Sequence, residues 1–393
     1  MSAFQKGRVS GVRFRVKDGK TIFGPEHLEK LADSAIGRQR VAMGDGSQIG
    51  WVAGDHVLDT DFSFEGCVVN NTLQFALRVD EVKIPGDLLQ AYTQVELEGL
   101  AAENPSGHPS KKQRREARLL AKERLEQEAK DGRFLRRRLV PVLWDGDSGE
   151  LLFGSGSTGA VDRLHSLFKQ TFDKRLEWMG AGARAIEIAE PLELAGKVDF
   201  AMPTTFARSH GDSLDVAWIP DETNRDFLGN ELLLWLWHYS EHVSDTVCIT
   251  TNNTLKEEEI VFMLANSMTL DCPRGQAGNE TIRSDAPGKL PEAIRAAQAG
   301  KLPRKAGLTL VRHHKAYELT LQAETFAVGV KLPACEEGDE QARRCERVDL
   351  IREFFQTLDL LYEAFLRRRL TSAWAKEVAA IQKWLGVRET VAA

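Results

Sequence analysis

The sequence has 393 residues, of which 52 are Lys or Arg and 58 are Asp or Glu, so its formal net charge is −6. This length is enough for two or three domains, or for one elaborate domain, and the 42% hydrophobic and 28% charged content is typical of a globular protein. The acidic balance argues against a histone-like protein that binds nucleic acid with its whole surface. It leaves room for binding through a segregated basic face.

The first hundred residues alternate between strand and helix patterns. In Arg8–Val16, apolar residues alternate with Arg13 and Arg15, which predicts a strand with one buried face. Pro25 begins a predicted helix. The next expected elements are extended chain at Gly44–Trp51, a strand at Leu73–Val82 and a helix at Leu88–Leu100.

The most unusual segment is Lys111–Arg138, which holds twelve Lys and Arg against five acids, a local net charge of +7. Ser110 is a suitable N-cap for a helix over Lys111–Lys130, which Asp131-Gly132 ends. An anionic partner that the basic residues contact through phosphates is one interpretation, and a solvated helix with internal ion pairs is the other.

The candidate DNA contacts in this segment are basic side chains, and the Arg136–Arg138 run favours the first interpretation because three successive arginines cannot all pair with nearby acids. Phe134 can stack on bases or wedge between them, with core packing or a dimer contact as the alternative. The basic candidates are Lys111, Lys112, Arg114, Arg115, Arg118, Lys122, Arg133, Arg136, Arg137 and Arg138.

The rest of the chain mixes the two patterns without a regular βαβ order, which predicts an α+β fold with antiparallel sheets and long helices. Residues 199–226 lack clear periodicity. The expected strands are at 139–144 with 150–153 (a hairpin), 247–251 with 259–264, 306–311 and 317–321, with extended chain at 186–194. The expected helices are at 160–172, 227–241, 290–299, 348–369 and 374–385.

Patterns of catalytic or metal-binding chemistry are weak. His313-His314 has no further ligand at a recognised spacing, and Gly154–Gly159 lacks the Gly-Lys-Ser/Thr of a phosphate-binding loop. The five cysteines, without C-x-x-C spacing, are typical of reduced thiols in a cytoplasmic protein (Cys67, Cys248, Cys272, Cys335 and Cys345). The sequence shows no signal-peptide core and no run of about 18 apolar residues. We expect a cytoplasmic protein without catalytic residues, metal or cofactor.

Several short motifs occur in an order that resembles the RdgC family of recombination-associated proteins. They are Gly50-Trp51-Val52, Lys83-Ile84-Pro85, the charged helix with Lys111 and Lys112, Trp144-Asp145 followed by Gly149–Phe153, the basic Ala293–Leu310 segment and Lys331-Leu332-Pro333. The resemblance covers residues 1–195 and 280–370. It carries over Lys301 and Lys305 as candidate DNA contacts, and we add Arg304 from the same basic segment.

The resemblance implies a ring-shaped homodimer that encircles double-stranded DNA without reading its sequence, at the nucleoid, and that modulates RecA-dependent recombination or replication. In this interpretation residues 1–100 form the N-terminal α/β part of the ring, 101–145 a projecting basic helical arm, 146–198 an α/β continuation and 286–393 the C-terminal α+β part. Residues 199–285 would be an insertion atypical of the family. The alternatives are a nuclease with a divergent metal site in 199–280, and a phage- or defence-related adaptor that binds another protein.

Overall fold

The computed structural model describes residues 4–38, 41–42, 46–102, 108–207, 216, 218–219, 223–250, 257–273, 275, 277–336 and 338–386. They form an α+β fold around a 14-stranded antiparallel sheet, which confirms the predicted class. The sheet is open, because its strand order begins at β11 and finishes at β2 without joining them. Among the helices in these ranges, none is long and apolar enough to cross a membrane.

The strands and helices have the following bounds. The strands are β1 (Val9–Val16), β2 (Val41–Ala42), β3 (Gln48–Val52), β4 (Val68–Val69), β5 (Thr72–Val82), β6 (Leu135–Asp145), β7 (Glu150–Phe153), β8 (Leu176–Trp178), β9 (Thr246–Thr250), β10 (Glu257–Asp271), β11 (Glu280–Arg283), β12 (Leu302–Arg312), β13 (Lys315–Gln322) and β14 (Val328–Lys331). The helices are α1 (Pro25–Asp33), α2 (Phe64–Cys67), α3 (Gly86–Ala102), α4 (Lys111–Glu128), α5 (Thr158–Phe172), α6 (Ala181–Ala189), α7 (Ala195–Asp199), α8 (Phe227–His242), α9 (Pro291–Gln298), α10 (Glu340–Arg369) and α11 (Trp374–Trp384).

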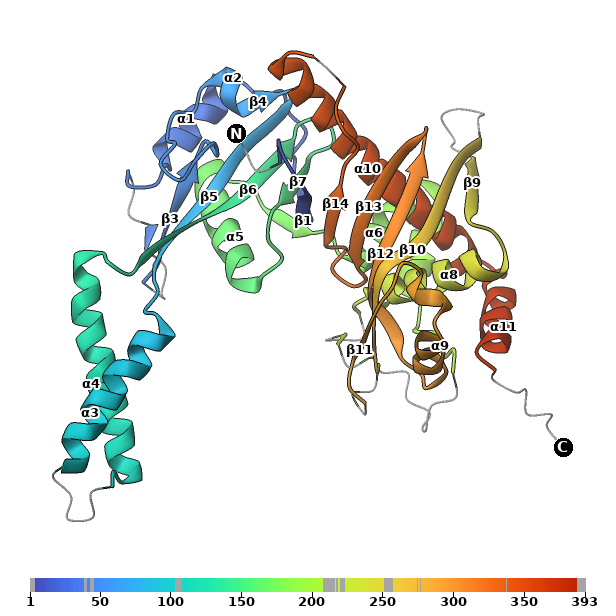
Figure 1. Cartoon of the computed structure of the whole chain (residues 1–393). Helices are drawn as coiled ribbons and strands as arrows, with labels where there is room; N and C mark the ends of the chain where they lie inside the picture. The colour runs from blue at the N-terminus through green and yellow to red at the C-terminus, as the bar shows by residue number, and fades with distance from the viewer. Residues whose placement is uncertain are drawn as a thin grey trace.

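The N-terminal half of the sheet packs one face against α1 and α5 (Figure 1). Alternate residues of β5, among them Phe75 and Leu77, point into this core, because successive side chains of a strand point to opposite faces of the sheet. Trp51 and Trp144 are fully buried there, and the Trp51 indole donates a hydrogen bond of 2.8 Å to the Thr171 hydroxyl. Burying two indoles with their N–H groups satisfied gives this half a large apolar core.

The C-terminal half is a second core, built on β10, β12, β13 and β14. Helix α8 is buried from Phe227 to His238, which explains why its sequence is apolar on every side. Helix α10 packs Phe354, Leu358 and Phe365 against the same core. The described residues within 199–285 thus supply a central helix, α8, and the strands β9, β10 and β11 of the main sheet, so they form part of the C-terminal core.

Strand β1 joins the two halves. Val9–Gly11 pair with β14, whereas Val12–Arg15 pair with β7, so one strand belongs to both parts of the sheet. Helix α10 also spans the junction, since Arg344 donates to the Glu65 carbonyl at 2.9 Å in the N-terminal half while Tyr362 donates to the Ala181 carbonyl at 3.0 Å. Figure 1 shows α10 crossing from one half to the other.

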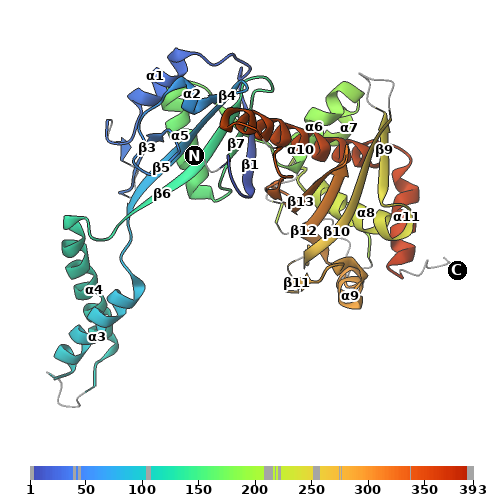
Figure 2. The same cartoon turned by 45° about the horizontal axis from the view of Figure 1, so that its top comes forward.

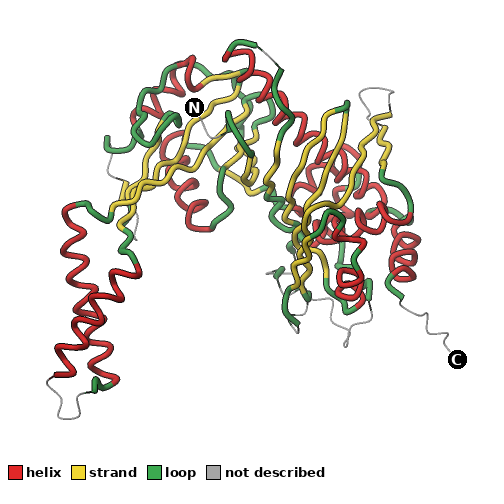
Figure 3. The backbone as a smooth tube through the Cα atoms, viewed as in Figure 1, coloured by secondary structure: helices red, strands yellow, loops and turns green. Residues whose placement is uncertain are grey.

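A helical hairpin extends from the N-terminal half and gives the molecule an arched outline. Strands β5 and β6 pair along their whole length, from Thr72 with Asp145 to Val82 with Leu135, and α3 and α4 continue from the far end of this ribbon (Figures 1 and 3). The hairpin and the C-terminal half extend from opposite ends of the molecule toward the same side, which Figure 2 shows from a second direction.

Two expectations about local structure are wrong. Residues Ile186–Leu194 were expected to be extended but belong mainly to α6 and a 3₁₀ turn at Glu190–Leu192, because Ala181, Ala185 and Ala189 recur at the helical spacing that buries one face. The projecting arm consists of α3 and α4 rather than residues 101–145, since Leu135–Asp145 form strand β6. The other expected elements at 8–16, 73–82, 160–172 and 306–321 are confirmed.

Candidate nucleic-acid interface

Helix α4 begins at a capping box. The Ser110 hydroxyl accepts a hydrogen bond from the Gln113 backbone N–H, and the Gln113 side chain accepts one from the Ser110 N–H at 2.9 Å. This arrangement satisfies two backbone donors that a helix N-terminus would otherwise leave free. The Gln113 amide also donates to the Leu100 carbonyl at 3.1 Å, which ties the start of α4 to the end of α3.

The two helices of the arm pack through small side chains on α4. Ala117, Ala121 and Leu125 are fully buried at i, i+4 and i+8, and therefore form one stripe facing α3. Leu120, which has a spacing compatible with the same face, is 40% exposed instead. The remaining surface of α4 is available to solvent.

A basic stripe runs along this available surface. Lys111, Arg115, Arg118 and Lys122 are exposed at i, i+4, i+7 and i+11, a spacing that places them on one face of the helix. We call these four residues the basic stripe. Lys112 and Arg114 are exposed on the same first turns. Within the part of the chain that the structure describes, Lys111, Lys112, Arg114, Arg115 and Arg118 have no ion-pair partner.

The base of the arm, in contrast, is largely neutralised. Lys122 pairs with Glu126 at 3.3 Å, and the Arg124 guanidinium lies 4.4 Å from the centre of the Tyr92 ring on α3. Tyr92 in turn donates to Glu128 at 2.9 Å. Sequence reasoning missed this contact, although Tyr92 stands in the predicted helix Leu88–Leu100 and faces the arm's own second helix.

Arg133, one of the candidate DNA contacts, is also paired. Its Nε donates to Asp131 at 2.9 Å, and its Nη1 lies 3.3 Å from Glu128. These hydrogen bonds hold the pKa of the exposed Asp131 carboxyl below its ordinary value. The neighbouring Phe134 is half-buried, and its carbonyl accepts a hydrogen bond from the Lys83 N–H at 3.0 Å. Both residues lie at the junction of arm and ribbon.

The three successive arginines do not form a single cluster. They lie on β6, where Arg136 faces Glu81 of β5, Arg137 faces Asp80 and Arg138 faces Val79. Because strand side chains alternate, Arg136 and Arg138 share one face and Arg137 points to the other. Arg137 Nε is 3.9 Å from Asp80 Oδ2, so one of the three arginines has an acidic neighbour. The sequence-based argument that this run lacks nearby acids to pair with is therefore only partly correct. All three remain exposed.

The C-terminal candidates lie in the other half of the molecule, away from the arm (Figure 1). Lys301 is buried and bonded to Glu280, and Arg304 donates to Glu324 at 2.8 Å while its guanidinium lies 4.4 Å from the Trp218 ring centre. Lys305 is exposed on β12. Of the three, Lys305 alone presents an accessible charge, and we leave Lys301 and Arg304 out of the proposed contact surface.

The described residues include no group of three or more His, Cys, Asp and Glu side chains that could hold a metal ion. Comparison of the chain with models of known protein families and with curated proteins found no match. The functional interpretation therefore depends on the geometry of the arm and on the order of the short motifs.

Proposed function

We propose that this protein binds double-stranded DNA without sequence specificity, encircles it as a homodimer of the RdgC type, and thereby modulates RecA-dependent recombination or replication. The observation that carries the proposal is the basic stripe on the projecting arm. Its cations are exposed and largely free of internal ion pairs, so they can neutralise phosphates and release counterions. Contacts of this kind position a protein on DNA but do not read its sequence.

The position of the stripe supports the same proposal. It begins at the tip of an arm that extends from the sheet, where neighbouring acids are few: Glu116 is the single acid in Lys111–Arg118. The overall charge of −6 would repel DNA elsewhere, which concentrates binding at the segregated basic surface. The arched outline leaves a concave side that a second copy could complete into a ring (Figure 2).

A triple charge reversal tests the stripe. We expect Lys111→Glu/Arg115→Glu/Arg118→Glu to reduce affinity for duplex DNA at least a hundredfold near 50 mM salt, because three phosphate contacts become repulsive. The slope of log K against log salt should become shallower by about 2.7, at ~0.9 per phosphate contact. Fluorescence anisotropy with labelled duplexes of two unrelated sequences, titrated across salt, measures both quantities.

The matched control is Lys197→Glu/Lys376→Glu/Lys383→Glu, which makes the same change of charge at exposed lysines in the other half of the molecule. It should retain most of the affinity. If both triple variants lose affinity equally, net charge rather than the stripe governs binding, and the proposed interface is refuted. Magnesium-dependent cleavage of the labelled DNA would instead favour the nuclease, and no retardation of any DNA would favour the adaptor.

A further inference from the structure

The arm is connected to the sheet through two short segments (Figure 1). Residues 83–85 lead from β5 to α3, and residues 132–134 lead from the end of the arm back to β6. Gly132 has a φ of +85°, a conformation that residues with a side chain rarely adopt, so the chain turns sharply there. The Lys83 N–H donates to the Phe134 carbonyl at 3.0 Å, which joins the two segments. Connections this short can act as a hinge unless side chains hold the arm in place.

Arg133 reaches back across Gly132 to the arm. Its Nε donates to Asp131 Oδ2 at 2.9 Å, and its backbone N–H donates to Asp131 Oδ1 at 3.0 Å. Its Nη1 donates at 3.3 Å to Glu128, the last residue of α4. The guanidinium is thus bonded to two carboxylates that lie on the far side of the turn from its own backbone.

Glu128 extends this contact to both helices of the arm. Its Oε2 accepts from Arg133, while its Oε1 accepts from the Tyr92 hydroxyl on α3 at 2.9 Å and lies 3.7 Å from Arg124 Nε on α4. An isolated ion pair at the surface contributes little to stability, but a network of several charges contributes more. One carboxylate therefore connects α3, α4 and the segment that leads to β6.

We propose that Arg133, Asp131 and Glu128 form a clasp that fixes the angle between the arm and the sheet. Its effect on DNA rests on the proposed function: the clasp holds the basic stripe in one orientation before DNA arrives, which lowers the entropic cost of binding. Arg133 is then a positioning residue, because its charge is used inside the protein and not on a phosphate.

The angle can be measured without DNA. Spin labels carried by non-canonical amino acids at the exposed Glu29 of α1 and Glu116 of α4 report the distance between the sheet and the arm by double electron–electron resonance. We expect Arg133→Gln to broaden the distribution of distances by about half or more, because the hinge is released. Lys130→Gln removes the same charge at a nearby exposed position and should leave the width unchanged. Equal widths in the native chain and Arg133→Gln would overturn the clasp.

The effect on DNA separates the clasp from a direct phosphate contact by its sign. If Arg133 bound phosphate, Asp131→Asn would free the guanidinium and tighten binding. Because the clasp needs Asp131, we expect this change to weaken binding to duplex DNA about threefold in about 0.1 M salt, with the slope of log K against log salt unchanged. Glu123→Gln removes an acid at an exposed position of α4 and should not weaken binding. Tighter binding by Asp131→Asn would overturn the positioning role.

The two measurements also separate this inference from the proposed function. Broadened distances in Arg133→Gln, with no DNA binding by the native chain, would support the clasp and refute the proposed function. Unchanged distances in Arg133→Gln, with salt-dependent DNA binding by the native chain, would refute the clasp and leave the basic stripe as the basis of binding. Circular dichroism checks that each variant is folded.

Discussion

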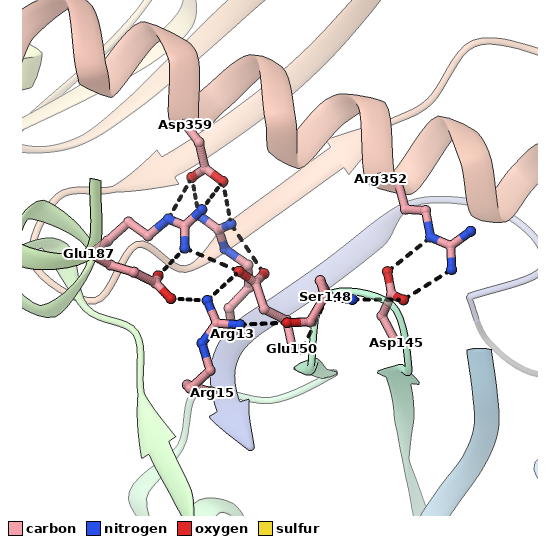
Figure 4. Close-up of polar contacts among 9 residues, drawn as sticks. Arg13, Arg15, Asp145, Ser148, Glu150, Glu187, Arg352 and Asp359 are labelled. Carbon is pink, nitrogen blue, oxygen red and sulfur yellow. Dashed lines mark hydrogen bonds and ion pairs between the residues drawn. The ribbon is translucent and has the colours of Figure 1, made fainter. Parts of the chain in front are cut away.

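Asp359 is a carboxylate on which two arginines converge. Arg13 donates to it at 2.9 and 2.7 Å, and Arg184 donates to it through Nε at 3.0 Å (Figure 4). Burial would raise the pKa of Asp359, but the charges of Arg13 and Arg184 outweigh that effect and lower the pKa to about 2. The ion pairs connect β1 of one half to α10 and α6. They therefore help to hold the two halves of the molecule together.

We expect Asp359→Asn to destabilise the protein by about 3 kcal/mol, because it removes the carboxylate that Arg13 and Arg184 share and leaves Glu150 as the carboxylate that both guanidiniums contact. The control Asp349→Asn removes a 62%-exposed carboxylate from the same helix, and should cost less than ~1 kcal/mol. Urea unfolding at neutral pH measures both. Equal losses in the two variants would contradict a special role for the buried pairs.

The same pairs predict an acid dependence with a defined sign. Because the pKa of Asp359 is lower in the folded protein than its ordinary value of 3.8, the stabilisation is fully present above that value and is lost as the pH falls toward 2. The Asp359→Asn variant should therefore lose less stability than the native chain when unfolding is followed from pH 4 to pH 2.

The sequence alone predicts little of this cluster. The alternation in Arg8–Val16 correctly predicts the strand, yet it places Arg13 on an outward, solvated face. In the structure Arg13 is 2% exposed, because α10, which lies more than 300 residues later, covers that face. No local pattern contains the information that Asp359 is the partner, since periodicity reports which residues share a face and not what covers it.

At the level of elements, the arm is held together mainly by its own two helices. The stripe of Ala117, Ala121 and Leu125 is buried against α3, while α3 has no buried residue of its own. A two-helix hairpin with so small a core should open at a free energy well below that of the sheet. Its order can therefore be perturbed without unfolding the rest of the protein.

We expect Ala121→Glu to disrupt the arm, because it places a larger, charged side chain in the buried stripe. Hydrogen exchange should become faster in both α3 and α4 and stay unchanged in β5 and β6. Gln127→Glu places the same residue at an exposed position of the same helix and should leave exchange unchanged. Unaltered exchange in Ala121→Glu would mean that the helices do not pack as described.

Element prediction succeeded where a pattern was long and failed at boundaries. Ser110 and Asp131-Gly132 correctly bracket α4, since caps and breakers are local signals. The sequence places Arg136–Arg138 with the arm, because three successive arginines show no alternation of polar and apolar residues that would indicate a strand. The ladder with Asp80 and Glu81 of β5, more than 50 residues earlier in the chain, makes it a strand.

At the scale of the whole molecule, the proposed ring makes a mass prediction. The chain has a mass of 43.8 kDa, and light scattering should give twice this value both free and on a short duplex. A monomer in both states, even at high protein concentration, would refute the ring.

The antiparallel α+β architecture was predictable from the strand and helix periods, whereas the arched outline depends on long-range pairing that no local pattern encodes.

The shared strand β1 has a consequence for how the protein is made on the ribosome. Val9–Gly11 emerge early, but their partners Val328–Val330 are more than 300 residues away. At ~5–20 residues per second, the gap between them lasts roughly 15–60 s. During that interval one end of β1 has no partner strand, and the C-terminal half cannot complete its sheet. The nascent chain thus carries an unpaired edge until synthesis is nearly past β14, which makes β1 the site where a chaperone would be needed most.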